Sequence, residues 1–200
     1  MKGLLAKIQR LPANVHTLSV WDIDDTLFTS KTNIYVIKNN QIVKKLSTSE
    51  YNSYKLRPGE VFDYSEFRDA SLFFHNAKPI SQSISKVKGI LESRNIMLLA
   101  LTARSDFNDK GLFLQKFKLY GLDMSTPLSH VARSGNLGLP TAAGKKEVLD
   151  QCLNTKKFKH TVMFDDDTRN LDAFLSLQAS HKNITFRAYA VHKGKIVPYG

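Results

Sequence analysis

Apolar and polar residues follow two rhythms along this chain, one typical of buried strands and one of amphipathic helices. Residues 96–101 (IMLLAL) form a continuous apolar run, which indicates a strand covered on both faces, and residues 161–164 (TVMF) are predicted to form a short strand. In residues 83–94 the apolar side chains recur at helical spacing, at Ile84, Val87, Ile90 and Leu91. Because such strands and helices alternate, the pattern predicts an α/β fold with a mainly parallel sheet.

Weaker signals complete this alternation. Further strands are predicted over residues 16–21, 129–133 and 184–191, and further helices over residues 2–10, 106–120, 141–153 and 170–179. Asp106 and Thr141 stand where N-caps are expected, since their side-chain oxygens can accept a free backbone N–H. The residues that follow 191 are expected to form a short tail.

Residues 29–80 interrupt the alternation. Two β-rich arms, NIYVIK and QIVKKL, flank an Asn-Asn pair that tolerates positive φ, so we expect a β-hairpin over residues 33–46. Ser47 is expected to cap a short helix, because a glutamate follows three residues later. Residues 55–64 contain a Pro-Gly turn and are expected to form a loop.

The composition is that of an ordinary globular chain, with 200 residues, 42% apolar and 24% charged. Cys152 is the only cysteine, which excludes an intrachain disulfide and a thiolate-rich zinc site. The longest apolar runs are too short to span a bilayer. Lys7 and Arg10 interrupt the apolar start, so it does not resemble a signal peptide. These features predict a cytoplasmic protein that does not associate with membranes.

The charge is strongly basic, with 29 Lys and Arg against 18 Asp and Glu and a net charge of +11. Six of the 18 acids form two clusters, Asp22, Asp24 and Asp25, and Asp165, Asp166 and Asp167. Elsewhere 12 acids face the 29 basic residues, which suits a polyanionic partner such as nucleic acid. The alternative is a well-solvated basic surface, because the basic residues form no long run.

Both acidic clusters directly follow predicted strands, and ligands of open parallel sheets bind beyond the carboxyl ends of the strands. Carboxylates gathered in one crevice repel each other unless a cation lies among them, and Mg²⁺ prefers such oxygen ligands. Asp22 and Asp24 are two residues apart and face the same way on an extended backbone. One can therefore attack a substrate while the other handles protons. The spacing around Asp22 excludes an EF-hand, and the spacing of Gly138 and Gly144 excludes a P-loop.

Four segments resemble, in order, the four motifs of the haloacid dehalogenase (HAD) superfamily. Residues 20–28 (VWDIDDTLF) look like motif I, apolar residues followed by DxDxT. Residues 98–106 (LLALTARSD) resemble motif II, a strand that ends in threonine. Residues 144–149 (GKKEVL) resemble the motif III lysine at a helix start, and residues 162–170 (VMFDDDTRN) are similar to the acidic motif IV.

The resemblance implies a three-layer sandwich with a Rossmann-like, mainly parallel sheet and a small inserted β-hairpin cap. It divides the chain into a core domain, residues 1–28 and 81–200, and a cap-like insertion, residues 29–80. It also implies a HAD-type phosphatase that needs Mg²⁺, because an acid two residues after the nucleophile is the phosphatase pattern of the family. The expected reaction is hydrolysis of a phosphomonoester through an aspartyl-phosphate.

The resemblance assigns a role to each motif residue. Asp22 would be the nucleophile, and Asp24 the general acid that later activates water. Thr102 would bind phosphoryl oxygens, although a turn hydroxyl bonded to the backbone is the alternative. Lys145 would offset negative charge, with its neighbour Lys146 as the alternative.

The same resemblance gives the expected metal ligands, which are a side-chain oxygen of Asp22, the backbone carbonyl of Asp24, and Asp166. Asp165 would orient the lysine. Asn170 at the end of the DDxxxN pattern favours this register, while Asp167 remains open as the metal ligand.

The insertion is small, which indicates an open site, and it mixes tyrosines and phenylalanines with basic residues. Such a surface can stack bases and track phosphates, or its aromatic side chains can simply anchor the insertion. Lys44 and Lys45 are candidates for substrate binding, and Arg104 either grips phosphate or pairs with an acid. We expect nucleotides or nucleic-acid 3′-phosphate ends as substrates, with some similarity to the phosphatase half of polynucleotide kinase-phosphatases. The alternatives are a small-metabolite (sugar phosphate) phosphatase and a non-catalytic binding protein on the same scaffold.

Overall fold

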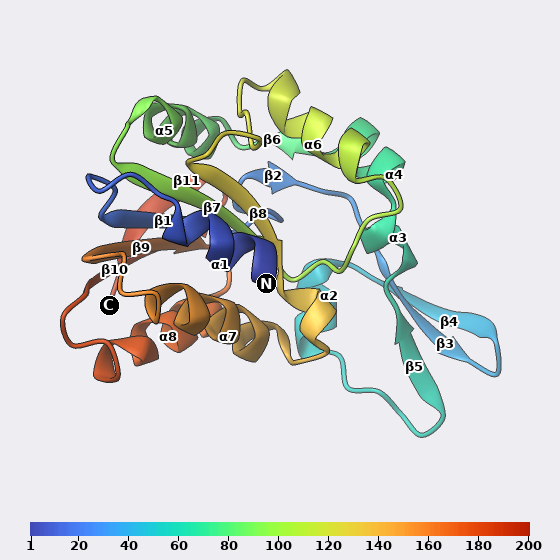
Figure 1. The fold of residues 1–200 in the computed structure, drawn as a ribbon. Helices are drawn as coiled ribbons and strands as arrows, with labels where there is room; N and C mark the ends of the chain where they lie inside the picture. Colours follow the sequence, from blue (N-terminus) through green and yellow to red (C-terminus); the bar gives the residue numbers. More distant parts are fainter.

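The computed structural model describes residues 1–200, apart from the side chains of Thr48, Ser49 and Asn52. Within this description, the main sheet has six strands in the order β11-β10-β9-β1-β7-β8 (Figure 1). Their bounds are Thr17–Trp21 (β1), Ile96–Thr102 (β7), Ser129–Arg133 (β8), His160–Asp165 (β9), Thr185–His192 (β10) and Lys195–Tyr199 (β11). Neighbouring strands are parallel, except that β11 is antiparallel to β10. The predicted α/β class and mainly parallel sheet are confirmed.

Helices cover both faces of this sheet (Figure 1). One face carries α1 (Lys2–Gln9), α7 (Thr141–Leu153) and α8 (Thr168–Leu175), and the other carries α4 (Ala70–Asn76), α5 (Ser81–Glu92) and α6 (Lys110–Leu119). Strand β7 serves both layers, because Leu99 and Leu101 pack into one hydrophobic cluster and Leu98 and Ala100 into the other. The alternation is what a strand buried on both faces requires.

The insertion builds a second, smaller sheet in the order β4-β3-β5 (Figure 1). Strands β3 (Ile34–Lys38) and β4 (Gln41–Leu46) form the predicted hairpin, and Asn39 and Asn40 have φ of 51° and 61° in its turn. Helix α2 (Thr48–Ser53) follows, and Ser47 and Glu50 form the predicted capping box. Strands β2 (Phe28–Thr29) and β6 (Lys78–Pro79) pair where the chain enters and leaves the insertion.

Two predicted irregular segments are in fact partly regular. The loop expected over residues 55–64 is wrong in its second half, because Glu60–Asp63 forms β5 and pairs with β3. The expected C-terminal tail is also wrong, because a turn at Lys193 and Gly194 returns the chain along β10 as β11. Both strands are short, and neither contains a buried residue, so their own sequences show little apolar alternation; pairing with a neighbour stabilises them.

The region before α5 contains two helices that the sequence pattern did not predict, α3 (Ser65–Arg68) and α4. Asp69 caps α4, and Phe73 on α4 joins the core cluster beneath α6. Two expected caps also differ: Asp109 rather than Asp106 caps α6, and α7 starts with Pro140 at the N-cap position without a side-chain cap. The remaining elements are two 3₁₀ helices, η1 (Ser134–Leu137) and η2 (Ser176–Ala179).

None of the helices described here has both the length and the apolar character needed to cross a bilayer.

Candidate active site

The two acidic clusters meet at the carboxyl ends of two adjacent strands. Trp21 of β1 pairs with Phe164 of β9, so Asp22 and Asp165 lie next to each other at the same edge of the sheet. The Asp22 backbone N–H donates to the Phe164 carbonyl at 2.9 Å and continues the ladder. Carboxylate oxygens of Asp22, Asp165 and Asp166 all lie within 4.8 Å of one another. The predicted crevice of carboxylates is therefore present.

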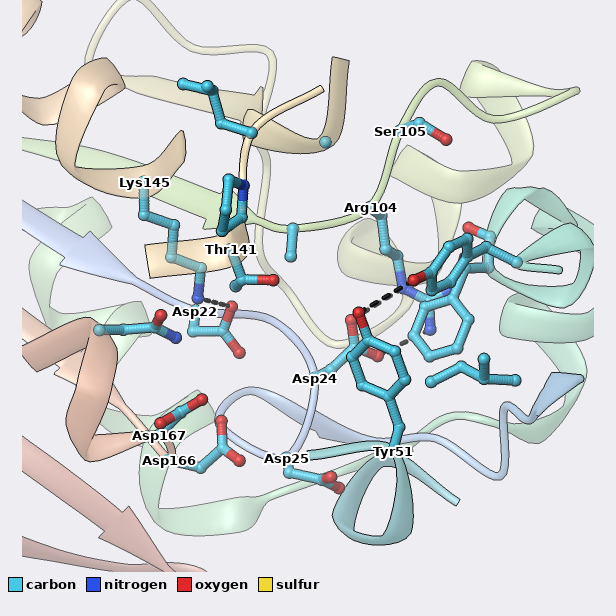
Figure 2. Close-up of a pocket in the computed structure, with 18 of the residues that line it drawn as sticks. Asp22, Asp24, Asp25, Tyr51, Arg104, Ser105, Thr141, Lys145, Asp166 and Asp167 are labelled. Carbon is cyan, nitrogen blue, oxygen red and sulfur yellow. Dashed lines mark hydrogen bonds and ion pairs between the residues drawn. The ribbon is translucent and has the colours of Figure 1, made fainter. Parts of the chain in front are cut away.

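Lys145 bridges this cluster from the first turns of α7 (Figure 2). Its Nζ donates to Asp22 Oδ1 at 2.5 Å and to Asp165 Oδ2 at 2.7 Å, and the residue is only 2% exposed. Burial by itself lowers the pKa of Lys145, but the charges of Asp165 and Asp22 raise it above its usual value. The ammonium is therefore charged. The geometry selects Lys145 over Lys146, which does not border the pocket.

Asp165 and Asp166 have different surroundings although they are adjacent. Asp165 is fully buried, and besides Lys145 it accepts the Asn170 side-chain N–H at 2.9 Å and the Asp167 backbone N–H at 3.0 Å. Its oxygens are thus occupied in holding Lys145. Asp166 borders the pocket, and the Thr26 hydroxyl donates a long 3.4 Å hydrogen bond to its carboxylate. Asp167 borders the pocket too, but it caps α8 and pairs with Arg169 at 2.6 Å.

The acidic cluster is set up to receive positive charge. Burial raises the pKa of Asp22 well above its usual value, and Lys145 opposes this only in part. Burial and the neighbouring Asp165 charge raise the pKa of Asp166 to about 7. Asn170 Oδ1 is buried at the pocket and has no hydrogen-bond partner among the described residues. The carboxylates of Asp22, Asp165 and Asp166 form a group that could hold a metal ion, and such oxygen donors suit a hard divalent cation.

Asp24 is held separately, by Arg104 (Figure 2). The guanidinium donates through Nε at 2.8 Å and Nη2 at 2.7 Å to the two Asp24 oxygens, and Ser30 donates to the same carboxylate at 2.8 Å. Burial raises the pKa of Asp24, but Arg104 outweighs burial and holds that pKa below its usual value. Asp24 is therefore ionised in this structure.

Arg104 is itself deeply enclosed. It is 2% exposed, donates to the Phe67 carbonyl at 3.1 Å, and its guanidinium lies 4.5 Å from the centre of the Phe67 ring. Of the two roles considered from the sequence, the structure displays the pair with an acid. The insertion thus takes part in placing Asp24, since Phe67 and Ser30 both belong to it.

Thr102 ends β7, and its hydroxyl accepts the Arg104 backbone N–H at 3.1 Å. The residue is 1% exposed and does not border the pocket, so here it acts as a turn hydroxyl. The loop after Thr102 is pressed against Gly135 of η1: a Cβ on Gly135 would overlap the Ala103 carbonyl and lie 2.8 Å from the Arg104 carbonyl carbon. Only glycine fits there, and this contact fixes the loop that carries Arg104.

A pocket of about 430 Å³ opens between the acidic cluster and the insertion (Figure 2). Tyr51, Tyr64 and Phe67 of the insertion border it together with Arg68. Arg68 Nε donates to Ser105 Oγ at 3.1 Å, and within the described residues its guanidinium pairs with no carboxylate. Lys44 and Lys45 lie on the exposed strand β4 and do not border the pocket; the Lys44 ammonium lies 4.9 Å from the centre of the Tyr54 ring.

Arg68 and Ser30 are the site residues that sequence reasoning missed, whereas Phe67 was among the aromatic residues of the insertion considered for stacking or anchoring. The available signal for Arg68 was an arginine directly after the aromatic pair Tyr64 and Phe67 in the insertion. Ser30 had no such signal, because its role depends on a contact with Asp24 that only the folded loop creates.

Comparisons with protein-family models, with curated proteins and with solved structures found no match for this chain. What the site can do is therefore argued from its residues.

Proposed function

We propose that this protein is a HAD-type, Mg²⁺-dependent phosphomonoesterase that acts through an aspartyl-phosphate on Asp22. The single observation that carries the proposal is the buried Asp22–Lys145–Asp165 bridge beside Asp166, at the carboxyl ends of β1 and β9. A structural ion pair needs one carboxylate, whereas Lys145 contacts two and a third, Asp166, lies beside them. Such repulsion is retained where a cation and a phosphoryl group are bound.

The reaction follows from the positions of the side chains. Lys145 holds Asp22 Oδ1, which leaves Oδ2 to attack phosphorus. As the new oxygen–phosphorus bond forms, the bond to the leaving oxygen breaks, and that oxygen takes a proton from Asp24. Asp24 then takes a proton from a water molecule, which attacks the aspartyl-phosphate and releases inorganic phosphate and the Asp22 carboxylate. Bound Mg²⁺ supplies positive charge that offsets the repulsion between carboxylates and phosphate.

The pair with Arg104 separates the two duties of Asp24. The ionised carboxylate in the structure is ready to act as a base, but it must gain a proton before it acts as an acid. A leaving group such as p-nitrophenolate departs without that proton. Substitution at Asp24 should therefore slow the hydrolysis of alkyl phosphates more than that of p-nitrophenyl phosphate. This difference separates the acid role of Asp24 from the nucleophilic role of Asp22.

Nucleotides or nucleic-acid 3′-phosphate ends are the substrate class that the pocket favours. Tyr51, Tyr64 and Phe67 border the same pocket as Asp22 and Asp166 and would supply aromatic surface to a base. Arg68 offers a guanidinium to a second anionic group of the substrate. Arg68→Gln should raise KM for a nucleotide several-fold and leave p-nitrophenyl phosphate turnover nearly unchanged. The matched change Lys44→Gln, outside the pocket, should affect neither substrate at moderate salt.

The deciding experiment measures hydrolysis of p-nitrophenyl phosphate with Mg²⁺ and after EDTA treatment. We expect turnover only with the metal and a loss of at least about 10³-fold in Asp22→Asn, the scale seen when a covalent nucleophile is removed. Asp25→Asn is the matched control: it borders the same pocket, and Asn tolerates its φ of 57°. Equal activity of the Asp22 and Asp25 variants would overturn the proposal. If the protein hydrolysed sugar phosphates faster than nucleotides in a substrate panel, the proposed chemistry would stand and the proposed substrate class would be rejected.

A further inference from the structure

Four segments lie side by side where the parallel strands begin, at the end of the sheet opposite the pocket. Thr17 of β1 pairs with both Ile96 of β7 and His160 of β9, and His160 pairs with Thr185 of β10. These strands are parallel, so the segments that lead into them emerge at one edge, the left edge in Figure 1. Asp22 and Asp165 lie at the other ends of β1 and β9.

Hydrogen bonds join the four segments into one surface. Asn14 Nδ2 donates to the Arg94 carbonyl at 3.2 Å, and Lys157 Nζ donates to the Leu11 carbonyl at 2.9 Å. The Lys159 backbone N–H donates to the His16 carbonyl at 2.8 Å. The Lys159 carbonyl in turn accepts the Thr185 backbone N–H at 2.9 Å. These bonds hold the backbones of the four segments side by side, so their basic side chains emerge from one surface.

The charge on this surface has one sign. Residues 10–17, 93–96, 154–160 and 180–187 contain no Asp or Glu and seven Lys or Arg, namely Arg10, Arg94, Lys156, Lys157, Lys159, Lys182 and Arg187. We call these seven residues the basic edge. All except Lys157 are exposed, and in the part of the chain described here none of the seven has a carboxylate within ion-pair distance. Two acids stand close to these segments: Asp150 is occupied by His181 at 2.7 Å, and the exposed Glu92 ends α5 directly before residues 93–96.

We propose that the basic edge binds the phosphate backbone of duplex nucleic acid. Unpaired like charges repel one another, and a polyanion that spans several segments removes that repulsion and releases its own counterions. These segments contain two phenylalanines: Phe158 is buried, and Phe186 is half-buried and packs against Phe174. Within the described segments no Phe, Tyr or Trp ring is therefore exposed for unpaired bases to stack on. Contacts are thus to phosphates, and binding is independent of base sequence.

This site is separate from the proposed phosphatase chemistry. Because it lies at the opposite edge of the sheet from Asp22, a duplex bound there leaves the pocket open. The protein can then stay on a nucleic acid while the pocket acts on a substrate or a free end.

Fluorescence anisotropy with a labelled DNA duplex tests the proposal. The variant Lys156→Glu/Lys159→Glu/Lys182→Glu reverses three charges of the basic edge. Its control, Lys78→Glu/Lys88→Glu/Lys118→Glu, reverses three exposed lysines on β6, α5 and α6, so both variants fall from a net charge of +11 to +5. We expect the basic-edge variant to bind the duplex at least about tenfold more weakly than the control variant. The slope of log K against log salt concentration should also fall in magnitude by about three, one for each lost phosphate contact.

Near-UV circular dichroism of both variants checks that they are folded, independently of any enzymatic activity. Equal weakening in the two variants would overturn the proposal, since net charge alone would then explain binding. The absence of binding at low salt would do the same, as would preference for anionic vesicles over the duplex. Loss of p-nitrophenyl phosphate turnover in Asp22→Asn bears only on the phosphatase proposal, and duplex binding should persist in that variant.

Discussion

Replacing Lys145 by methionine should destabilise the protein strongly, and by an amount that depends on pH. Methionine has a similar length and no charge, so the change leaves Asp22 and Asp165 buried without their shared cation. Breaking a buried ion pair costs about 3–5 kcal/mol. Lys146→Met is the matched control, because Lys146 is the next residue of α7 and makes no ion pair within the described residues.

The pH dependence follows from how the variant would relieve the repulsion between the two buried carboxylates. One buried carboxyl, with an ordinary pKa of 3.8, must stay protonated in the folded variant. At about 1.4 kcal/mol for each pH unit above that pKa, this costs about 4 kcal/mol at pH 7 and about 1.5 kcal/mol at pH 5. The folded variant binds one more proton than the unfolded chain, so its stability must rise as pH falls from 7 to 5.

Urea denaturation in metal-free buffer at the two pH values measures this difference. We expect Lys145→Met to lose about 4 kcal/mol relative to Lys146→Met at pH 7 and to recover more than half of that loss at pH 5. A Lys145→Met protein as stable as Lys146→Met at pH 7 would refute the reasoning, since the buried carboxylates would then need no cation.

Two further outcomes follow from the site. Mg²⁺ should raise the melting temperature of the EDTA-treated protein at pH 8. This increase in melting temperature should shrink as pH falls through about 7. Burial and Asp165 raise the pKa of Asp166 to that value, so below it a proton competes with the metal for this carboxylate. Differential scanning fluorimetry at several pH values checks this. Gly135→Ala should lower stability and also slow turnover, because the added Cβ would displace the loop that carries Arg104. Gly138→Ala is the control, because no atom lies within 4 Å of a Cβ added there. It should lower stability through its φ of 66° and leave the rate of turnover nearly unchanged.

The central sheet and the acidic cluster could be predicted because their signals are local. Residues 96–101 are apolar throughout, as a strand covered on both faces must be. Asp22 directly follows β1, and Asp165 is the last residue of β9. Parallel pairing then places the two acids together. Even the turn at Asn39 and Asn40 was predictable, since their side chains tolerate positive φ.

The features that were not predicted depend on contacts between distant segments. Strand β5 forms because it pairs with β3, and β11 forms because it pairs with β10; neither segment has a strong apolar pattern of its own. The pairing of Arg104 with Asp24 joins residues 80 positions apart. The sequence left two roles open for Arg104, because a guanidinium suits a phosphate and a carboxylate equally well.

Detection of phosphate on Asp22 is the most direct test of the proposed chemistry. The protein is mixed with p-nitrophenyl phosphate and Mg²⁺, quenched in acid within a turnover, digested and examined by mass spectrometry. We predict a phosphorylated peptide containing Asp22, more of it in Asp24→Asn because loss of the base slows hydrolysis of the intermediate, and none in Asp22→Asn. Turnover that proceeds without any phosphorylated Asp22 peptide would contradict covalent catalysis by this residue.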